Sequence, residues 1–323
     1  MEKARFKWVL RERNRKIAAK TEVFTEQQAR RVRSFHSSFK EYSPTPLIEL
    51  TSLAQHLGIK NLFVKDESYR FELNAFKVLG GSFAIGSYIA NELGEDIDDL
   101  PYMRLVSDEV RSLLGSKTFI TTTDGNHGRG VAWTANRLKQ QAIVYMPQGS
   151  AAERLANIRA EGAQAEITDM NYDDTVRYTS ELAQKNGWII VQDTAWDGYT
   201  RIPLWIMQGY MTMALEAYEQ LPVKPTHIFL QAGVGSLAGS VQGFFADIYG
   251  SSCPLTFIVE PKGADCLYQT AAANDGSLHS VTGRLETIMA GLACGEPNSI
   301  AWEILGNLSD GFISCPDYTA AQG

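Results

Sequence analysis

From residue 118 onwards the chain alternates short runs of β-branched and other apolar residues with amphipathic segments. The short runs are typical of strands, and the longer segments have the spacing of helices with one apolar face. The predicted strands are 118–123, 142–146, 165–168, 188–191, 227–231 and 255–259, and the predicted helices are 127–139, 151–160, 172–185, 203–219, 237–248 and 264–273. Such alternation indicates right-handed β-α-β units, so we predict an α/β fold with mostly parallel sheets covered by helices on both faces.

Two places interrupt the alternation and suggest two domains. The segment 193–203 has aromatic residues and turn formers between predicted elements, and a second crossing is expected near 80–83. Connections are short, without a low-complexity linker or an internal repeat. We predict a large domain of residues 1–82 and 204–323 and a small domain of residues 83–203, each with its own open sheet.

Composition and charge exclude several classes of function. The 323 residues are 44% hydrophobic and 21% charged, as in an ordinary globular protein, and the formal charge of −7 does not favour nucleic acid. The N-terminus lacks the apolar core of a signal peptide, and no stretch approaches the roughly 18 apolar residues of a membrane helix. We therefore expect a cytoplasmic protein with no nucleic-acid or membrane partner, most simply a homodimer.

The four cysteines give no sign of a metal centre. They form no CxxC pair and have no spacing with histidine that suits zinc. We expect reduced thiols and no metal site, while a bridge between two of them stays possible. The cysteines are Cys253, Cys266, Cys294 and Cys315.

Lys77 is the first candidate for chemistry. It ends the run Asn74-Ala-Phe-Lys77, directly ahead of the apolar stretch 78–90, which is predicted to be helical. A lysine amine withdrawn from water in such a place can form a Schiff base. The alternative is a solvated surface group, because most lysines are exposed.

A glycine-rich loop, Gly233–Gly239, follows the predicted strand 227–231 and opens a helix. Glycines allow close approach of the backbone, and free N–H groups at a helix start bind phosphate. Because Glu260 ends the next predicted strand, where a ribose-binding acid would lie, a dinucleotide site is an alternative. A close-packed turn without a ligand is another. An NAD-dependent oxidoreductase, however, leaves Lys77 unexplained.

A second segment, Thr121–Gly128, also runs from a strand into a helix. Its hydroxyl groups and backbone amides suit a carboxylate, and the amide of Asn126 suits a phenolate oxygen. The same residue types are favoured at helix N-caps, so an elaborate cap is the alternative.

A reactive lysine, a phosphate loop and an anion-binding turn together meet the needs of pyridoxal 5′-phosphate. The chain resembles the tryptophan-synthase-like (fold type II) family of pyridoxal-phosphate enzymes, and the motifs of that family occur in the expected order. They are Thr45-Pro-Leu47, Lys65-Asp-Glu67, Asn74–Lys77, Gly125-Asn-His-Gly128, Gly233–Gly239 and Val259-Glu-Pro261. Within the family, the segments 65–77 and 289–298 and the acid Asp124 resemble the diaminopropionate ammonia-lyases.

The resemblance implies α,β-elimination of 2,3-diaminopropionate to pyruvate and two ammonia, through an aminoacrylate. Lys77 would hold the cofactor as a Schiff base and remove the α-proton, while Asp124 would pair with the β-ammonium group or protonate it. As a base on the opposite face, Asp124 would also permit the D isomer. Cofactor binding would fall to Asn126 (the 3′-oxygen) and to Gly233, Val234, Gly235, Ser236 and Leu237 (the phosphate), and substrate binding to Thr122, Thr123, Asp124, Gly125 and Asp193.

Several alternatives stay open. Asp124 suits an N-cap, and Asp193 suits a turn. A threonine or serine dehydratase shares the lysine and the loop but lacks an acid at position 124, and a non-catalytic scaffold would keep only the fold. The family places a hydroxyl or thiol at the pyridine nitrogen; the spacing does not choose between Ser314, Cys315 and Thr319, and we expect further large-domain elements beyond Gly323.

Overall fold

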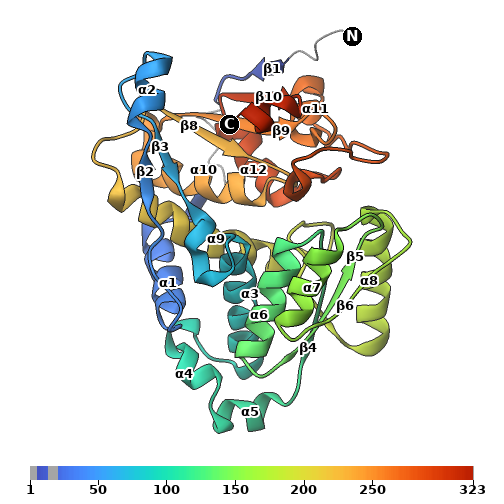
Figure 1. The fold of residues 1–323 in the computed structure, drawn as a ribbon. Coiled ribbons are helices and arrows are strands. Elements are labelled where there is room, and N and C mark those ends of the chain that lie inside the picture. Colours follow the sequence, from blue (N-terminus) through green and yellow to red (C-terminus); the bar gives the residue numbers. More distant parts are fainter. Residues whose placement is uncertain (1–5, 14–20, 323) are drawn as a thin grey trace.

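The computed structural model describes residues 6–13 and 21–322, whose strands form two four-stranded sheets and one two-stranded sheet (Figure 1). The strands are β1 (Lys7–Leu10), β2 (Leu47–Glu49), β3 (Phe63–Lys65), β4 (Thr118–Thr122), β5 (Gln141–Met146), β6 (Gln164–Ile167), β7 (Ile189–Ile190), β8 (His227–Gln231), β9 (Leu255–Pro261) and β10 (Gly311–Cys315). The helices are α1 (Glu26–Ser37), α2 (Thr51–Leu57), α3 (Lys77–Leu93), α4 (Tyr102–Leu105), α5 (Asp108–Leu114), α6 (Asn126–Arg137), α7 (Ala152–Ala160), α8 (Tyr172–Asn186), α9 (Arg201–Gln220), α10 (Ser236–Tyr249), α11 (Cys266–Ala273), α12 (Ser299–Leu308) and α13 (Tyr318–Gln322).

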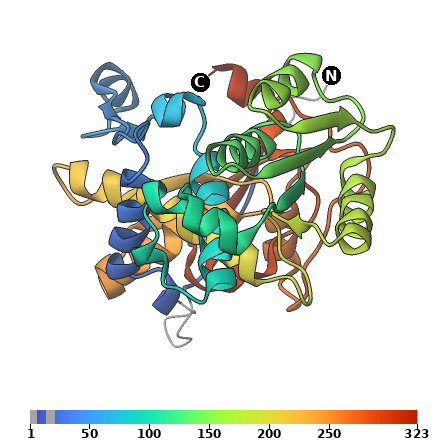
Figure 2. The same cartoon turned by 90° about the horizontal axis from the view of Figure 1, so that it is seen from below.

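The first large sheet has the order β6-β5-β4-β7, and all of its pairs are parallel. Right-handed crossovers put α6 and α7 on one face and α8 on the other, as Figure 2 shows. The sequence predicts these elements correctly to within about two residues. The strand predicted at 188–191 is shorter, although the Val191 N–H still donates to the Ile120 carbonyl at 2.9 Å.

The second large sheet has the order β1-β10-β9-β8, in which β8, β9 and β10 are parallel and β1 is an antiparallel edge. The pattern from residue 227 predicts β8 and β9 but not β1 or β10. In Figure 1 this sheet lies above and the β4–β7 sheet below, with α9 between them. The expected α/β architecture with mostly parallel sheets is therefore present.

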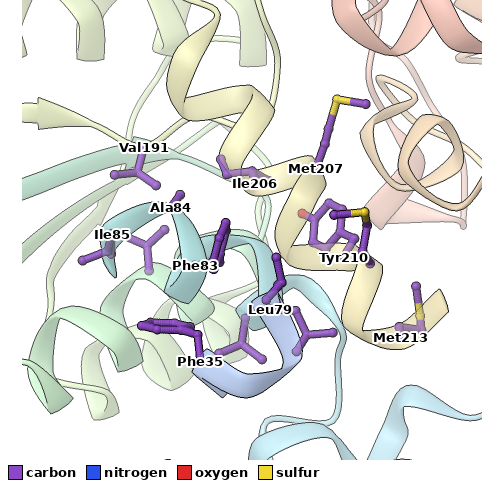
Figure 3. Packing of buried hydrophobic residues seen from close by; sticks show 14 of the residues in the cluster. Phe35, Leu79, Phe83, Ala84, Ile85, Val191, Ile206, Met207, Tyr210 and Met213 are labelled. Carbon is purple, nitrogen blue, oxygen red and sulfur yellow. The ribbon is translucent and has the colours of Figure 1, made fainter. Parts of the chain in front are cut away.

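Two long helices, α3 and α9, pack against each other at very short range. A Cβ atom added to Gly209 of α9 would lie 2.3 Å from the Leu79 carbonyl oxygen, and one added to Gly80 of α3 would lie 2.7 Å from Ile206 and Tyr210. Figure 3 shows side chains of both helices in the core. These close contacts hold α3, and with it Lys77, rigidly against α9. The helix α3 runs unbroken across position 82, so the domain boundary predicted there stays a prediction.

A buried ion cluster fixes the segment that leads to Lys77 onto α9. The Arg70 guanidinium, which is 0% exposed, donates to both oxygens of Glu216 at 2.9 and 2.7 Å and to both oxygens of Glu67 at 2.8 and 2.9 Å. Lys65 adds an ion pair to Glu216 at 2.8 Å. Burial raises the pKa of Glu216, but the charges of Arg70 and Lys65 outweigh it and lower the pKa to about 2.

Replacing Glu216 with alanine should lower the free energy of unfolding by about 3 kcal/mol, because Arg70 and Lys65 then lose a buried counter-charge. Glu219, on the same helix, pairs with Arg30 and Arg33 at the surface, so Glu219→Ala should cost less than about 1 kcal/mol. Urea unfolding at neutral pH measures both variants. Equal losses would show that the buried cluster contributes no more than the surface pairs.

His36 should make the stability pH-dependent. Its Nε2–H donates to the Leu79 carbonyl at 3.0 Å, and its Nδ1 accepts from the Thr212 hydroxyl at 2.7 Å. Burial, with a smaller contribution from Arg70, lowers the pKa of His36 from 6.5 to about 3. The unfolded chain therefore binds a proton that the folded chain excludes. This contribution to stability is complete above pH 6.5 and is lost as the pH falls towards 3.

We expect the free energy of unfolding to fall by about 1 kcal/mol between pH 6 and pH 5 on account of His36. Buried His127 also has a lowered pKa and acts in the same direction. The test is therefore the difference between wild type and His36→Gln in urea unfolding at both pH values. Parallel pH dependences in the two proteins would contradict the assignment.

Candidate active site

The Lys77 amine is paired with a buried carboxylate. Nζ of Lys77, the first residue of α3, lies 2.5 Å from Oδ2 of Asp193, which is 5% exposed and follows β7. Burial lowers the pKa of Lys77, but the negative charge of Asp193 outweighs it and raises the pKa above its ordinary value. Burial raises the pKa of Asp193, but the charge of Lys77 and its hydrogen bond lower it to about 2. The pair is therefore charged at neutral pH.

The backbone just before Lys77 is unusual. Phe71, Glu72 and Asn74 have φ values of 49°, 60° and 57°, in the left-handed region that side chains disfavour. Arg129 of α6 holds the intervening carbonyl of Leu73 at 3.2 Å. Strained backbone of this kind persists only where the surroundings enforce it, and it is common at functional sites.

The glycine loop, defined as Gly233–Leu237, joins β8 to α10 (Figure 1). Gly235 has a φ of 100°, and a Cβ atom there would lie 3.2 Å from Leu267, so the position suits only glycine. Ser236 donates its hydroxyl to the Asp193 carbonyl at 2.5 Å and accepts from the Asn298 amide at 2.8 Å. The backbone N–H groups of Ser236 and Leu237, in the first turn of α10, have no acceptor within that helix. The loop is a rigid set of donors at a positive helix end.

Some residues of the turn 121–128 make local hydrogen bonds, whereas Asn126 lines a cavity. The Thr122 hydroxyl lies 2.7 Å from that of Thr179 and 3.2 Å from the Thr175 carbonyl, so it is engaged with α8. Thr123 accepts from the Gly125 N–H at 3.0 Å and fixes the start of α6. Asn126 begins α6, is exposed and lines a cavity with Lys77. The geometry thus leaves Asn126 and the N–H groups of the first turn of α6 available to a ligand, but not the Thr122 hydroxyl or the N–H groups of Thr123 and Gly125.

Asp124 is held by an arginine that sequence reasoning missed. Nη1 of Arg154, on α7, donates to both the carboxylate and the carbonyl of Asp124, each at 3.0 Å. Burial raises the pKa of Asp124, and the charges of Lys77 and Arg154 oppose this effect only in part. The alternative role as a helix N-cap is not seen, because Gly125 is the cap residue of α6 and no side chain caps it.

Two adjoining cavities share Val234 and Cys294. The inner one is lined by Phe76, Lys77, Asn126, Asp193, Tyr210, Gln231, Ala232, Gly233, Val234, Gly235, Ser236, Leu237, Gly291, Leu292 and Cys294. The outer one is bounded by Tyr172, Asp173, Val176, Arg177, Ser180, Thr194, Trp196, Val234, Cys294 and Glu296. Lys77, Asn126, Asp193 and the glycine loop, all predicted from sequence, therefore meet at one cavity. Tyr210 was missed because its helix predicts only a core face.

Glu260 does not serve as a ribose-binding acid. Its side chain is 0% exposed and accepts from the Leu267 and Tyr268 N–H groups at 2.9 and 2.7 Å, at the start of α11. Glu260 therefore caps a helix and is not the ribose-binding acid that the dinucleotide alternative requires. All four cysteines are free, so the bridge that the sequence left possible is not formed.

The residues at the inner cavity suit pyridoxal phosphate. Lys77 offers an amine, the glycine loop offers N–H donors at a helix start, and Asn126 offers an amide. These groups match the aldehyde, phosphate and phenolate of that cofactor. Comparison with protein families points to the same group, since residues 39–323 match the model described as pyridoxal-phosphate dependent enzyme.

The chain belongs to this family.

Individual pyridoxal-phosphate enzymes narrow the comparison. Diaminopropionate ammonia-lyase of Salmonella typhimurium is 53% identical over 296 residues, which cover 90% of this chain and 73% of the relative. The crystal structure of Escherichia coli diaminopropionate ammonia lyase in complex with an aminoacrylate-PLP azomethine reaction intermediate matches with a TM-score of 0.88 and 49% identity, over 99% of this chain and 79% of that one. A catabolic L-threonine dehydratase of Staphylococcus aureus is 27% identical over 271 residues, 83% of this chain and 67% of the relative.

These comparisons confirm the resemblance inferred from the motifs, and they favour the ammonia-lyases over the dehydratases. The partner of the pyridine nitrogen is still not assigned, because Ser314, Cys315 and Thr319 do not line the inner cavity. Among the helices of the described residues, none has the length and apolar character needed to cross a membrane.

Proposed function

We propose that this pyridoxal-phosphate enzyme eliminates the β-amino group of 2,3-diaminopropionate and releases pyruvate and two ammonia. The main support is that two carboxylates belong to the elements that surround the Lys77 amine. Asp193 lies 2.5 Å from it, and Asp124 is in the turn that starts α6, two residues before Asn126 of the inner cavity, where Arg154 holds it. A diamine substrate has two amino groups to be met by such charges.

Lys77, Asn126 and the glycine loop hold the cofactor in this proposal, at its aldehyde, 3′-oxygen and phosphate. Bound pyridoxal phosphate supplies the electron sink that makes the substrate α-proton removable. Asp193 binds the ammonium group of Lys77. We infer that the Asp193 carboxylate receives the substrate amino group in place of the Lys77 amine. The Lys77 amine is then free to act as the base.

The substrate carboxylate binds to the turn that starts α6, through the N–H groups of the first turn of α6, which have no acceptor within the helix. We omit the Thr122 hydroxyl, which is engaged with α8, and the N–H groups of Thr123 and Gly125, which donate to the Tyr145 carbonyl and the Thr123 hydroxyl. Asp124, fixed by Arg154, pairs with the β-ammonium group. A protonated β-amino group leaves as ammonia, which is much easier than leaving as an amide ion. Serine and threonine have no positive charge at the β-position. Asp124 thus favours a diamine over a hydroxy amino acid.

The ratio of ammonia to pyruvate tests the proposal. We expect two ammonia per pyruvate with 2,3-diaminopropionate, whereas a dehydratase gives one ammonia per pyruvate from serine and one per 2-oxobutanoate from threonine. The assay uses the purified protein with added pyridoxal phosphate and compares the three substrates at equal concentration. Preferred turnover of serine or threonine would support the dehydratase alternative. The cytoplasmic location and the homodimer stay predictions, and light scattering tests the second.

A further inference from the structure

Tyr210 has a buried hydroxyl group without a protein partner. Its side chain is 1% exposed, and within residues 6–13 and 21–322 its hydroxyl oxygen makes no hydrogen bond. A buried polar group of this kind is costly, and most such groups in folded proteins are satisfied. The orphan hydroxyl therefore indicates a partner that the chain itself does not provide.

The residue lines the inner cavity together with Lys77, Asn126 and the glycine loop. Its ring is held in place from two sides. A Cβ atom on Gly80 would lie 2.7 Å from the ring, and the Phe76 ring packs edge-on against it with centroids 5.1 Å apart. Figure 3 shows the ring of Tyr210 among the core side chains of α9 and α3. The packing therefore fixes the direction of the hydroxyl group.

Tyr210 acts as a neutral donor. Burial raises the pKa of its phenol, and the positive charge of Lys77 opposes this only in part, so the proton stays on the oxygen at neutral pH. The carboxylate in the same wall, Asp193, already accepts from Lys77 at 2.5 Å. The N–H groups of the glycine loop are donors as well. The lining of the inner cavity therefore has several hydrogen-bond donors and suits a ligand that has acceptor atoms of its own.

We propose that the Tyr210 hydroxyl donates a hydrogen bond to the phosphate group of bound pyridoxal phosphate and is a further positioning residue for the cofactor. The phosphate has the acceptor oxygens and the negative charge that this set of donors lacks. The cofactor has two other acceptors: the 3′-oxygen, which Asn126 meets, and the pyridine nitrogen, which pyridoxal also has, so a comparison of the two ligands separates a contact to that nitrogen from one to the phosphate. This inference rests on the cofactor part of the proposed function and is independent of the substrate.

The test compares two ligands and two variants. Tyr210→Phe removes only the hydroxyl and keeps the packed ring. Tyr218→Phe is the matched control, since Tyr218 lies on the same helix but packs against Phe244 and Tyr249. Dissociation constants of pyridoxal phosphate and of pyridoxal, which lacks the phosphate, are measured for the apoenzymes. Melting temperatures of the apoenzymes are recorded in parallel.

We expect Tyr210→Phe to weaken pyridoxal phosphate binding by at least about tenfold and pyridoxal binding by less than about twofold. The apoenzyme should melt no lower than wild type, because the lost hydroxyl has no partner in the protein. Tyr218→Phe should change neither affinity.

Equal loss of both ligands would overturn the phosphate contact, and unchanged pyridoxal phosphate binding would overturn it too. A lower melting temperature of the Tyr210→Phe apoenzyme would show a structural hydroxyl instead. Failure of the wild type to bind pyridoxal phosphate is a different result, because it contradicts the cofactor assignment and with it the proposed function.

Discussion

Replacing Lys77 with alanine is expected to lower kcat/KM for 2,3-diaminopropionate by about 10⁴-fold or more. The change removes both the covalent anchor of the cofactor and the amine that takes the α-proton, and loss of a general base alone costs 10²–10⁴-fold. No other described lysine lines the inner cavity, so none can replace it. The fold should survive at some cost in stability, because the change leaves the buried carboxylate of Asp193 without its counter-charge.

Two measurements distinguish this role from a general loss of structure. Borohydride reduction of the wild type with bound cofactor, followed by peptide mapping, should label Lys77, while the variant should show neither the label nor the visible absorbance band. Lys185→Ala, an exposed lysine on α8, is the matched control and should behave as wild type. Labelling of another lysine, or turnover by Lys77→Ala within tenfold of wild type, would contradict the assignment.

The sequence predicts the regular part of the fold well because periodicity is a local property. The segments from 118 to 273 have clear strand or helix spacing, and the structure places them as expected. β1 and β10 were missed for a physical reason. β1 is a short edge strand that exists only through its pairing with β10, from Lys7 opposite Ser314 to Leu10 opposite Gly311. No local pattern reports a partner some 300 residues away.

The sequence predicts a residue of the candidate site only where that residue and its neighbours along the chain form a recognisable motif. Lys77 and the glycine loop have such neighbours. Arg154 and Tyr210 do not, because each reaches the site from a helix whose pattern is explained by packing alone. Other motif residues proved structural. Lys65, Glu67 and Arg70 belong to the buried ion cluster with Glu216, so the motif that contains them secures the fold around the site.

For the same reason, the sequence leaves the role of Asp193 open between substrate binding and a turn. A single aspartate after a short strand is usually a turn residue, and the sequence could not show that the chain returns to the start of α3. In the structure its carboxylate neutralises Lys77, and its carbonyl accepts from Ser236 of the glycine loop. Asp193 thus links the amine, the glycine loop and the β4–β7 sheet, so a shift of any one of them would displace the others.

Replacing Asp124 with asparagine should lower kcat/KM for L-2,3-diaminopropionate by about 10- to 100-fold and leave serine, where it turns over at all, nearly unaffected. The amide is isosteric but has no charge, so the β-ammonium group loses an interaction worth about 1.5–3 kcal/mol. The expected signature is therefore a fall in the ratio of the two specificity constants. An equal fall for both substrates would indicate a role in positioning the turn rather than in recognising the diamine.

The D isomer gives a sharper test of the same residue. If Asp124 removes the α-proton from the opposite face to Lys77, the D-isomer rate should fall by about 10²–10⁴-fold in Asp124→Asn. Because burial raises the pKa of Asp124, the acid limb of the D-isomer rate should lie at higher pH than for an ordinary aspartate. Asp169→Asn, an exposed acid in the turn after β6, controls for charge removal alone. Undiminished D-isomer turnover in Asp124→Asn argues against this base and leaves Asp124 the single task of binding the β-ammonium group.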